Sequence, residues 1–197
     1  MATIIRLNQA ITDMNAPKVV EVITSHSFNG GDLSKTDTAF GGREWQMANT
    51  DNAWQPSQGG ITASARGALS LSGLPEDLGI EITVRSLQDS GRLLLSLRVD
   101  TETGDNREVL EINSDGSIRF NPRVGGHQHA GAWYSAGLVK SGSKVKIAAV
   151  DNVVRAYVDG KLAIEQPTIA PIGNLLMVST YQISSGLLID DLIVTAA

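Results

Sequence analysis

The residues of this chain that are best suited to chemistry lie in one segment, residues 125–134, which reads GGHQHAGAWY. His127 and His129 stand two residues apart, so an extended strand would turn both imidazoles to the same side. Imidazole nitrogen suits transition metals, and the pair is therefore a candidate for part of a metal site. No third ligand follows nearby in the sequence, and a glycine-rich surface loop is the competing interpretation.

The same segment has the residue types that hold sugars. Proteins commonly bind a sugar by placing an aromatic ring against its C–H face while a few polar groups fix its hydroxyls. The candidates are an aromatic platform of Trp133 and Tyr134 and the hydrogen-bonding side chains of His127, Gln128 and His129. Trp54, in the polar run NTDNAWQ, is a further candidate platform, with a place in the hydrophobic core as the alternative.

A second polar segment, residues 100–106 with the sequence DTETGDN, offers clustered oxygen atoms. Calcium takes typically six to eight oxygen ligands, so Asp100, Glu102 and Asp105 are candidates for holding it. The segment lacks the regularly spaced acidic residues of a dedicated calcium loop, and a solvated hairpin tip is the preferred interpretation. We therefore expect no cofactor, with calcium as the alternative.

The elements that must position these residues are β-strands. From Lys18 onward the hydrophobic pattern repeats every second residue, which is typical of strands with one face in a core. The hydrophobic sets are Leu78, Ile80, Ile82 and Val84 in residues 78–86, and Leu93, Leu95, Leu97 and Val99 in residues 92–100. Ser96 and Arg98 are expected on the opposite face of the second strand, toward solvent. Further strands are predicted over residues 107–113, 117–121, 144–150, 153–158, 172–182 and 187–195.

Turn-forming residues lie between these strands. The sequences Asp89-Ser90-Gly91, Asp115-Gly116 and Asp159-Gly160 stand where hairpin turns need a positive φ. With roughly 11–14 strands at this spacing, the pattern predicts an all-β fold, a two-sheet antiparallel jelly-roll sandwich over residues 18–197. Residues 1–17 lack the alternation and end at a proline, so we expect a short N-terminal arm that packs on the domain or docks onto a neighbouring subunit.

Composition restricts the partners. Sixteen Lys and Arg against 21 Asp and Glu give a net charge of −5. Binding to nucleic acid or to anionic lipid depends mainly on positive charge, so a negative net charge disfavours both partners. No apolar run in the sequence is long enough to span a bilayer. The chain has no cysteine, which excludes thiolate catalysis and cysteine-ligated metals. The sequence therefore predicts no nucleic-acid and no membrane partner.

Several segments resemble the concanavalin A-like family of jelly-roll domains, which includes laminin G-like domains, lectins and glucanases. The opening of such domains is similar to SFNGGDL at residues 27–33, followed by TDT at residues 36–38 and Trp45. Residues 154–160, VRAYVDG, are similar to the family's hairpin with a Y-x-D-G turn. Residues 187–195 are similar to its closing strand, in which Asp190 or Asp191 precedes an apolar residue.

Domains with this opening are often found in minor tail, tail-tip and other surface proteins of bacteriophage particles. The resemblance therefore implies a non-enzymatic virion structural protein, made in the host cytoplasm, with a lectin-like glycan-binding surface. Its implied partners are other virion proteins and cell-surface glycans, in a homo-oligomer for which a trimer is the first expectation. A purely structural decoration or assembly protein is the alternative.

Catalytic motifs are missing from the sequence. Glycoside hydrolases of the family carry their acid and nucleophile on one strand as E-x-D-x-x-E, and this chain has no such hexad. Glu108 and Glu111 are three residues apart, so they are expected on opposite faces of a strand. The G-x-S-x-G elbow, the P-loop and H-E-x-x-H are also absent. We therefore expect no enzymatic activity, with a carbohydrate hydrolase of non-standard site as a second alternative.

Overall fold

The computed structural model describes residues 22–26, 46–48, 54–57, 60–63, 68–100, 104–171, 173–183 and 186–196. Every regular element within these ranges is a β-strand, which confirms the all-β class. The expected arm over residues 1–17, and the opening segment at residues 27–45 that carries part of the family resemblance, lie outside the described residues and stay predictions.

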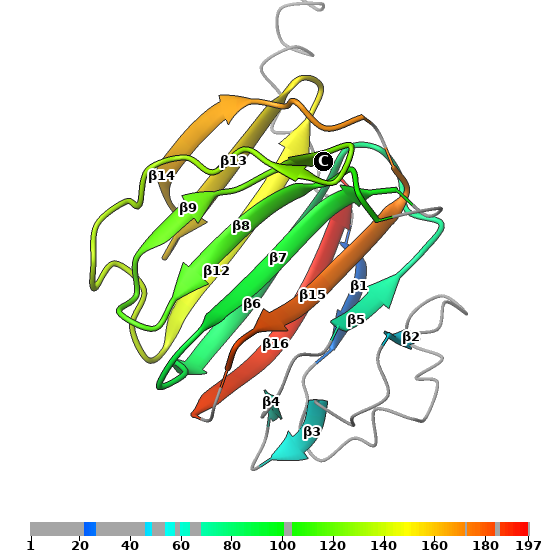
Figure 1. Cartoon of the computed structure of the whole chain (residues 1–197). Coiled ribbons are helices and arrows are strands. Elements are labelled where there is room, and N and C mark those ends of the chain that lie inside the picture. Colours follow the sequence, from blue (N-terminus) through cyan, green and yellow to red (C-terminus); the bar gives the residue numbers. More distant parts are fainter. Residues whose placement is uncertain are drawn as a thin grey trace, which may run out of the picture.

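The strands form two antiparallel sheets that stack face to face, with the six-stranded sheet in front of the eight-stranded one in Figure 1. The eight-stranded sheet has the order β14 (Lys161–Pro167), β13 (Val153–Val158), β12 (Ser143–Val150), β6 (Leu78–Ser86), β16 (Leu187–Ala196), β4 (Gly60–Ala63) and β3 (Trp54–Ser57), and β1 (Val22–His26) also pairs with β16. The six-stranded sheet has the order β2 (Gln46–Ala48), β5 (Ala68–Leu71), β15 (Leu175–Tyr181), β7 (Arg92–Val99), β8 (Glu108–Asn113) and β9 (Ile118–Phe120). A small hairpin of β10 (Arg123–Val124) and β11 (His127–Gln128) follows β9. The prediction of a two-sheet antiparallel sandwich is confirmed.

The hydrophobic core lies between the sheets. The faces predicted for β6 and β7 are both buried, and each of their eight hydrophobic side chains is at most 1% exposed. Burying one side chain of this size contributes about 1.5–3 kcal/mol, so this interlayer contact is the main source of stability. These side chains are Leu78, Ile80, Ile82 and Val84 of β6, and Leu93, Leu95, Leu97 and Val99 of β7.

The solvent-facing side predicted for β7 is wrong at two positions. Ser96 is fully buried between its cross-strand neighbours Met177 of β15 and Val109 of β8. Arg98 is 1% exposed and has a φ of 53°, so it leaves the strand alternation. Its guanidinium donates to a carboxylate oxygen of Asp77 at 2.9 Å and to two backbone carbonyls, which satisfies a charge that the core would otherwise exclude.

The hairpin turns have the predicted chemistry. Asp159 and Gly160 join β13 to β14 with φ values of 50° and 75°, as a two-residue hairpin turn requires. Gly91, between β6 and β7, has a φ of 79°, and a Cβ there would lie 2.3 Å from the carbonyl oxygen of Tyr181. Asp115, between β8 and β9, accepts hydrogen bonds from the backbone N–H and the hydroxyl of Ser117, which lower the pKa of its carboxyl.

One irregular segment extends the six-stranded sheet beyond β9. The backbone N–H groups of His129, Gly131 and Tyr134 donate to the carbonyls of Pro122, Phe120 and Ile118, at 2.9, 2.9 and 2.7 Å. Residues 129–134 therefore run antiparallel beside β9 as an additional edge. Because neighbouring residues of an extended chain point to opposite sides, this segment presents Trp133 and Tyr134 to different faces of the molecule.

Candidate functional site

The polar residues of interest lie on the outer face of the six-stranded sheet. In the strand register Arg119 of β9 is opposite Glu111 of β8, which is opposite Leu94 of β7. Their chain neighbours point inward to the core, so strand alternation turns these three side chains outward. Arg92 of β7 and Tyr181 of β15 are also opposite each other on this face.

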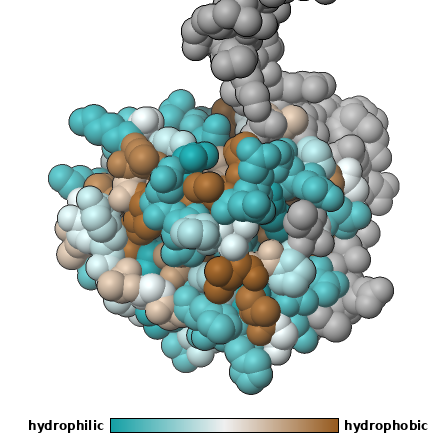
Figure 2. Space-filling view, turned by 90° about the horizontal axis from the view of Figure 1, so that it is seen from above, coloured by the Kyte–Doolittle hydropathy of each residue, from teal (hydrophilic) through white to brown (hydrophobic). Residues whose placement is uncertain are grey.

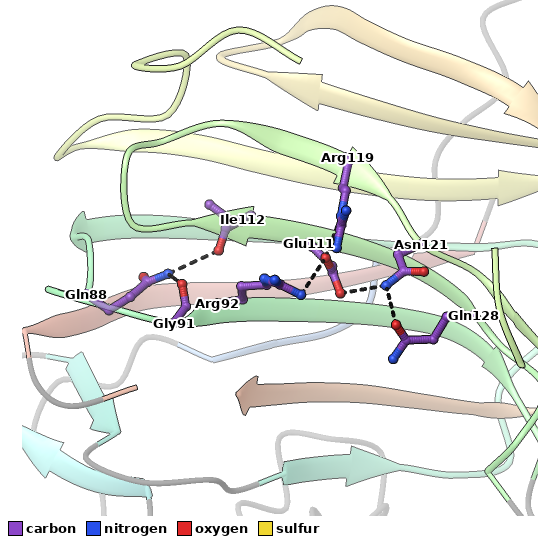
Figure 3. A network of polar contacts seen from close by, with 8 residues as sticks. All are labelled: Gln88, Gly91, Arg92, Glu111, Ile112, Arg119, Asn121 and Gln128. Atoms are coloured by element: carbon purple, nitrogen blue, oxygen red, sulfur yellow. Dashed lines mark hydrogen bonds and ion pairs between the residues drawn. The ribbon is translucent and has the colours of Figure 1, made fainter. Parts of the chain in front are cut away.

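Glu111 is the centre of a network of polar contacts on this face (Figure 3). Its side chain is only 4% exposed, and its Oε2 accepts from Arg119 Nε at 2.7 Å and from Arg92 Nη1 at 3.4 Å. Its Oε1 accepts from Asn121 Nδ2 at 2.8 Å. Charge-assisted hydrogen bonds of this kind are stronger than neutral ones, so one buried carboxylate joins three strand segments in a fixed arrangement.

Two amides extend the network at its ends. Asn121 Nδ2 also donates to Gln128 Oε1 at 3.4 Å, which links the β10–β11 hairpin to the sheet. The Oδ1 atom of Asn121 is buried and has no hydrogen-bond partner among the described residues. At the other end Gln88 donates to the carbonyls of Gly91 and Ile112, which ties the β6–β7 turn to β8 (Figure 3).

Aromatic rings lie against the arginines of the network. The guanidinium carbon of Arg119 is 4.3 Å from the centroid of the Trp133 ring, and that of Arg92 is 5.6 Å from it. Arg92 is also 5.9 Å from the centroid of Tyr181. Cation–π contacts hold Trp133 in place, yet the side chain keeps 37% of its surface exposed. A partly exposed ring with a fixed orientation can stack on a ligand.

A hollow of about 190 Å³ opens beside these rings. Its polar lining consists of Arg92, Glu111, Asn121, Arg123, Gln128 and Gln182, and Leu94, Val109 and Tyr181 add apolar surface. Glu111 is the one carboxylate among the described residues that line it. We call this space the charged hollow.

A second hollow of about 320 Å³ lies at the β13–β14 hairpin. Tyr134, Leu138, Val158 and Leu162 line it with apolar surface, and Asp159 of the turn and Lys161 at the start of β14 also line it. Tyr134 and Leu162 are 48% and 53% exposed. We call this space the apolar hollow.

Exposed large hydrophobic side chains are few in the described part of the chain, and four of the five lie at or beside the two hollows. The face shown in Figure 2 is mostly hydrophilic, with hydrophobic side chains in small patches. Within the described ranges, no helix has the length and apolar character needed to cross a membrane. The larger exposed aromatic residues, Trp133, Tyr134 and Tyr181, therefore stand out at the two hollows.

The structure separates the predicted sugar contacts. Trp133 is not a lining residue of the charged hollow, but its ring lies against Arg92, which lines it. Tyr134 lines the apolar hollow, so the two rings do not form the expected shared platform. Gln128 lines the charged hollow, whereas His127 and His129 are exposed and do not line it. Residues on either side of Gln128 in an extended hairpin strand point away from it, which explains the separation.

Trp54 belongs to the core, and its prediction as a surface platform is wrong. The side chain is 2% exposed and packs within the hydrophobic cluster between the sheets. A ring in this position cannot stack on a ligand from solvent.

The candidate metal ligands are not gathered into a site in the described part of the chain. There, no group of three or more histidine, aspartate or glutamate side chains is placed to hold a metal ion, and His127, His129 and Asp105 form no such group. Asp100 Oδ2 accepts from Asn106 Nδ2 at 3.2 Å, a contact that closes the loop on itself. Glu102 lies outside the described residues.

The prediction that Glu108 and Glu111 face opposite ways is confirmed. Glu108 is fully buried, and its Oε1 accepts from the backbone N–H groups of Ile169 and Ala170 at 2.8 and 2.9 Å. Glu111 faces outward into the network described above. The arginines that complete the network were missed, because their pairing depends on strand register rather than on any local motif.

Comparison with known proteins identifies the fold. No protein-family model and no curated protein matches the chain. Among solved structures, an endo-β-1,3-glucanase from Pyrococcus furiosus shares 13% identity over 90% of this chain and 94% of its own, with a TM-score of 0.65. The Emp47p carbohydrate recognition domain shares 14% over 90% and 97%, with a TM-score of 0.63. The carbohydrate-binding module CBM66 from Bacillus subtilis shares 14% over 77% and 94%, with a TM-score of 0.61.

These likenesses define the class of the protein by fold. The chain is a jelly-roll sandwich of the type found in concanavalin A-like and galectin-like lectin and glucanase domains. At these identities the likeness extends to the fold alone.

Proposed function

We propose that this chain is a non-enzymatic, lectin-like protein that binds a glycan in the charged hollow. The observation that carries the proposal is the Trp133 ring, fixed over Arg119 and Arg92 beside a hollow with polar groups on its walls. An exposed ring and a few positioned hydrogen-bonding groups are what sugar recognition requires. Two of the similar structures are named for carbohydrate binding or recognition, which supports the proposal.

Binding without hydrolysis is favoured by the carboxylates of the site. A retaining glycosidase needs two carboxyl groups about 5–5.5 Å apart, one of them able to donate a proton. Among the described residues that line the charged hollow, Glu111 is the one carboxylate, and two arginines hold it in ion pairs. The glucanase among the similar structures makes hydrolysis the rival function to be tested.

A glycan array with the purified protein tests the proposal. We expect binding to at least one glycan, no new reducing ends when that glycan is incubated with the protein, and loss of binding in Trp133→Ala. If no glycan binds, the protein is a purely structural component and the proposal is wrong. If the bound glycan is cleaved, the non-enzymatic part is wrong.

We also propose a setting for this function on the surface of a bacteriophage particle, as a minor tail, tail-tip or decoration protein made in the host cytoplasm. The basis is the resemblance of residues 27–45 and 154–160 to domains of such particles. Its partners would be other virion proteins and cell-surface glycans, without nucleic acid or membrane. A homo-oligomer, a trimer first, would convert weak single-site binding into avidity.

Two measurements test this setting. Genes for tail or capsid proteins are expected beside the gene for this chain, and a neighbourhood of unrelated metabolic genes would contradict it. Light scattering of the purified protein is expected to give the mass of an oligomer, whereas the mass of one 20.9 kDa chain would contradict the oligomer.

A further inference from the structure

The charge around the charged hollow points to the class of glycan, an inference that rests on the proposed function. We infer that the hollow prefers an anionic sugar, one that carries a carboxylate or a sulfate group.

The first argument is the local balance of charge. Arg92 and Arg123 line the hollow, and Glu111 is the one carboxylate among the described lining residues. Arg119 does not line the hollow but forms an ion pair with Glu111. Three guanidinium groups therefore face one carboxylate. The chain as a whole has a net charge of −5, so this positive region runs against the average of the molecule.

The second argument is the state of Arg123. Arg92 and Arg119 share the Glu111 carboxylate, whereas the Arg123 guanidinium has no ion pair or side-chain hydrogen bond with any described residue. Its backbone is held firmly, because its N–H donates to the Arg107 carbonyl at 2.9 Å and its carbonyl accepts from the Arg107 N–H at 3.0 Å. A fixed strand thus presents an unpaired cation at the wall of a hollow.

The third argument concerns the geometry of recognition. A guanidinium is a planar fork of five donors that fits a carboxylate or a sulfate oxygen pair, and such charge-assisted bonds exceed neutral ones in strength. A neutral sugar can contact Gln128, Asn121 and the Trp133 ring, but it cannot form an ion pair with Arg123. An anionic sugar uses the same contacts and adds this ion pair.

The test compares sugars that differ in charge alone. Calorimetric titration would use trigalacturonic acid, its fully methyl-esterified form, which is uncharged, and a sulfated galactose oligosaccharide with its unsulfated parent. We expect the acid, the sulfated sugar or both to bind at least roughly tenfold more tightly than the matched neutral sugar, with the difference shrinking as salt rises. The two anionic arms distinguish the carboxylate from the sulfate.

Arg123 variants assign the effect to this residue. Arg123→Gln is expected to weaken binding of the anionic sugar roughly tenfold and to weaken binding of the matched neutral sugar much less, and Arg123→Lys is expected to recover part of the loss. Lys161→Gln removes a cation beside the apolar hollow instead and is the matched control, expected to have no effect.

The outcomes distinguish a failure of this inference from a failure of the proposed glycan-binding function. Equal binding of charged and uncharged partners, or binding of neutral glycans alone on the array, overturns the inference and leaves the lectin proposal standing. An array on which no glycan of either kind binds overturns both.

Discussion

The charged and apolar hollows share one segment of chain but differ in how they are built. Trp133 lies against Arg92 at the wall of the charged hollow, and the next residue, Tyr134, lines the apolar one. Behind Trp133, Arg92 of β7 and Arg119 of β9 converge on the buried carboxylate of Glu111 in β8. Behind Tyr134 is β14, an edge strand that pairs with β13 alone.

This difference indicates which of the two aromatic side chains is held in a fixed orientation for binding a ligand. Recognition is stronger when the contacting groups are already held in place, because less conformational entropy is lost on binding. Trp133 is held by two guanidinium groups, whereas among the described residues no cation lies over Tyr134. Exposure alone does not distinguish them, since Tyr134 is the more exposed of the two.

The largest expected effect is on stability, and it comes from adding one methyl group at the β6–β7 turn beside the charged hollow. In Gly91→Ala the new Cβ would lie 2.3 Å from the carbonyl oxygen of Tyr181 and 2.4 Å from that of Gln182, at a φ of 79°. We expect a loss of about 3 kcal/mol in the free energy of unfolding, because backbone that borders the hollow must move. Urea denaturation measures the loss.

Gly160→Ala is the matched control at the turn beside the apolar hollow. Its φ of 75° is similar, but a Cβ there meets nothing within 4 Å. We expect a loss of about 1 kcal/mol from the backbone conformation alone. Equal losses in the two variants would show that the charged hollow is no more tightly packed than the apolar one.

The second effect comes from removing the central carboxylate. Glu111→Gln keeps the shape of the side chain but leaves Arg119, which is 14% exposed, and the more exposed Arg92 without their shared counter-charge. We expect a loss of about 2 kcal/mol in unfolding free energy, together with weaker glycan binding as Trp133 loses its support.

Glu165→Gln provides the comparison for an exposed ion pair. Arg155 Nε on β13 lies 2.6 Å from Glu165 Oε2 on β14, and the two side chains are 33% and 48% exposed. Because water and salt screen such a pair, its removal is expected to cost less than about 0.5 kcal/mol. A Glu111 variant as mild as this one would contradict the view that the network organises the site.

The third effect distinguishes the aromatic neighbours by binding rather than by stability. Trp133→Ala is expected to weaken glycan binding at least roughly tenfold, which corresponds to about 1.4 kcal/mol. Tyr134→Ala is expected to leave binding unchanged, because its ring lines the other hollow. Calorimetry with a glycan identified on the array measures both, and a reversed order would assign the ligand to the apolar hollow.

The smallest effect concerns the turn that anchors the segment shared by both hollows. The carbonyls of Asp115 and Gly116 accept from the N–H groups of Gly137 and Val139 at 2.7 and 3.0 Å. Hydrogen bonds from Ser117 lower the pKa of the Asp115 carboxyl from its ordinary value of 3.8. This contribution to stability is therefore present above that value and lost as the pH falls through the lowered pKa.

Ser117→Ala removes the hydroxyl donor and tests this linkage. We expect a small loss of stability at pH 7 that disappears in acid, and an upward shift of the Asp115 pKa in an NMR titration. Both hollows are expected to respond alike, since the turn supports the segment common to them. An unchanged pKa would contradict the assigned cause.

The strands and turns could be predicted from the sequence because each depends on residues close together in the chain. The alternation in β6 and β7 and the Asp159-Gly160 turn are local signals, and the structure has them in the expected places. Arg98 was misplaced because its positive φ breaks the alternation, and nothing in the pattern of its neighbours indicates that break.

The site could be predicted only in part because it depends on register. Arg92 is 19 residues before Glu111, and Arg119 is 8 residues after it, so no spacing rule connects the three. The segment 125–134, predicted to supply an aromatic contact for a glycan, contains Trp133 beside the network's arginines, and its part in ligand binding stays a prediction. Which of Trp133 and Tyr134 faces the polar network depends on how this segment pairs with β9, a long-range property.

NMR mapping of the bound ligand tests the central claim most directly, that the charged hollow is the binding site. Backbone amide shifts of the isotope-labelled protein would be followed during titration with the tightest-binding glycan of the array. The account predicts that the largest shifts occur at Leu94, Glu111, Arg123 and Gln128. Shifts concentrated at Tyr134, Leu138 and Leu162, with the network residues unmoved, would contradict it.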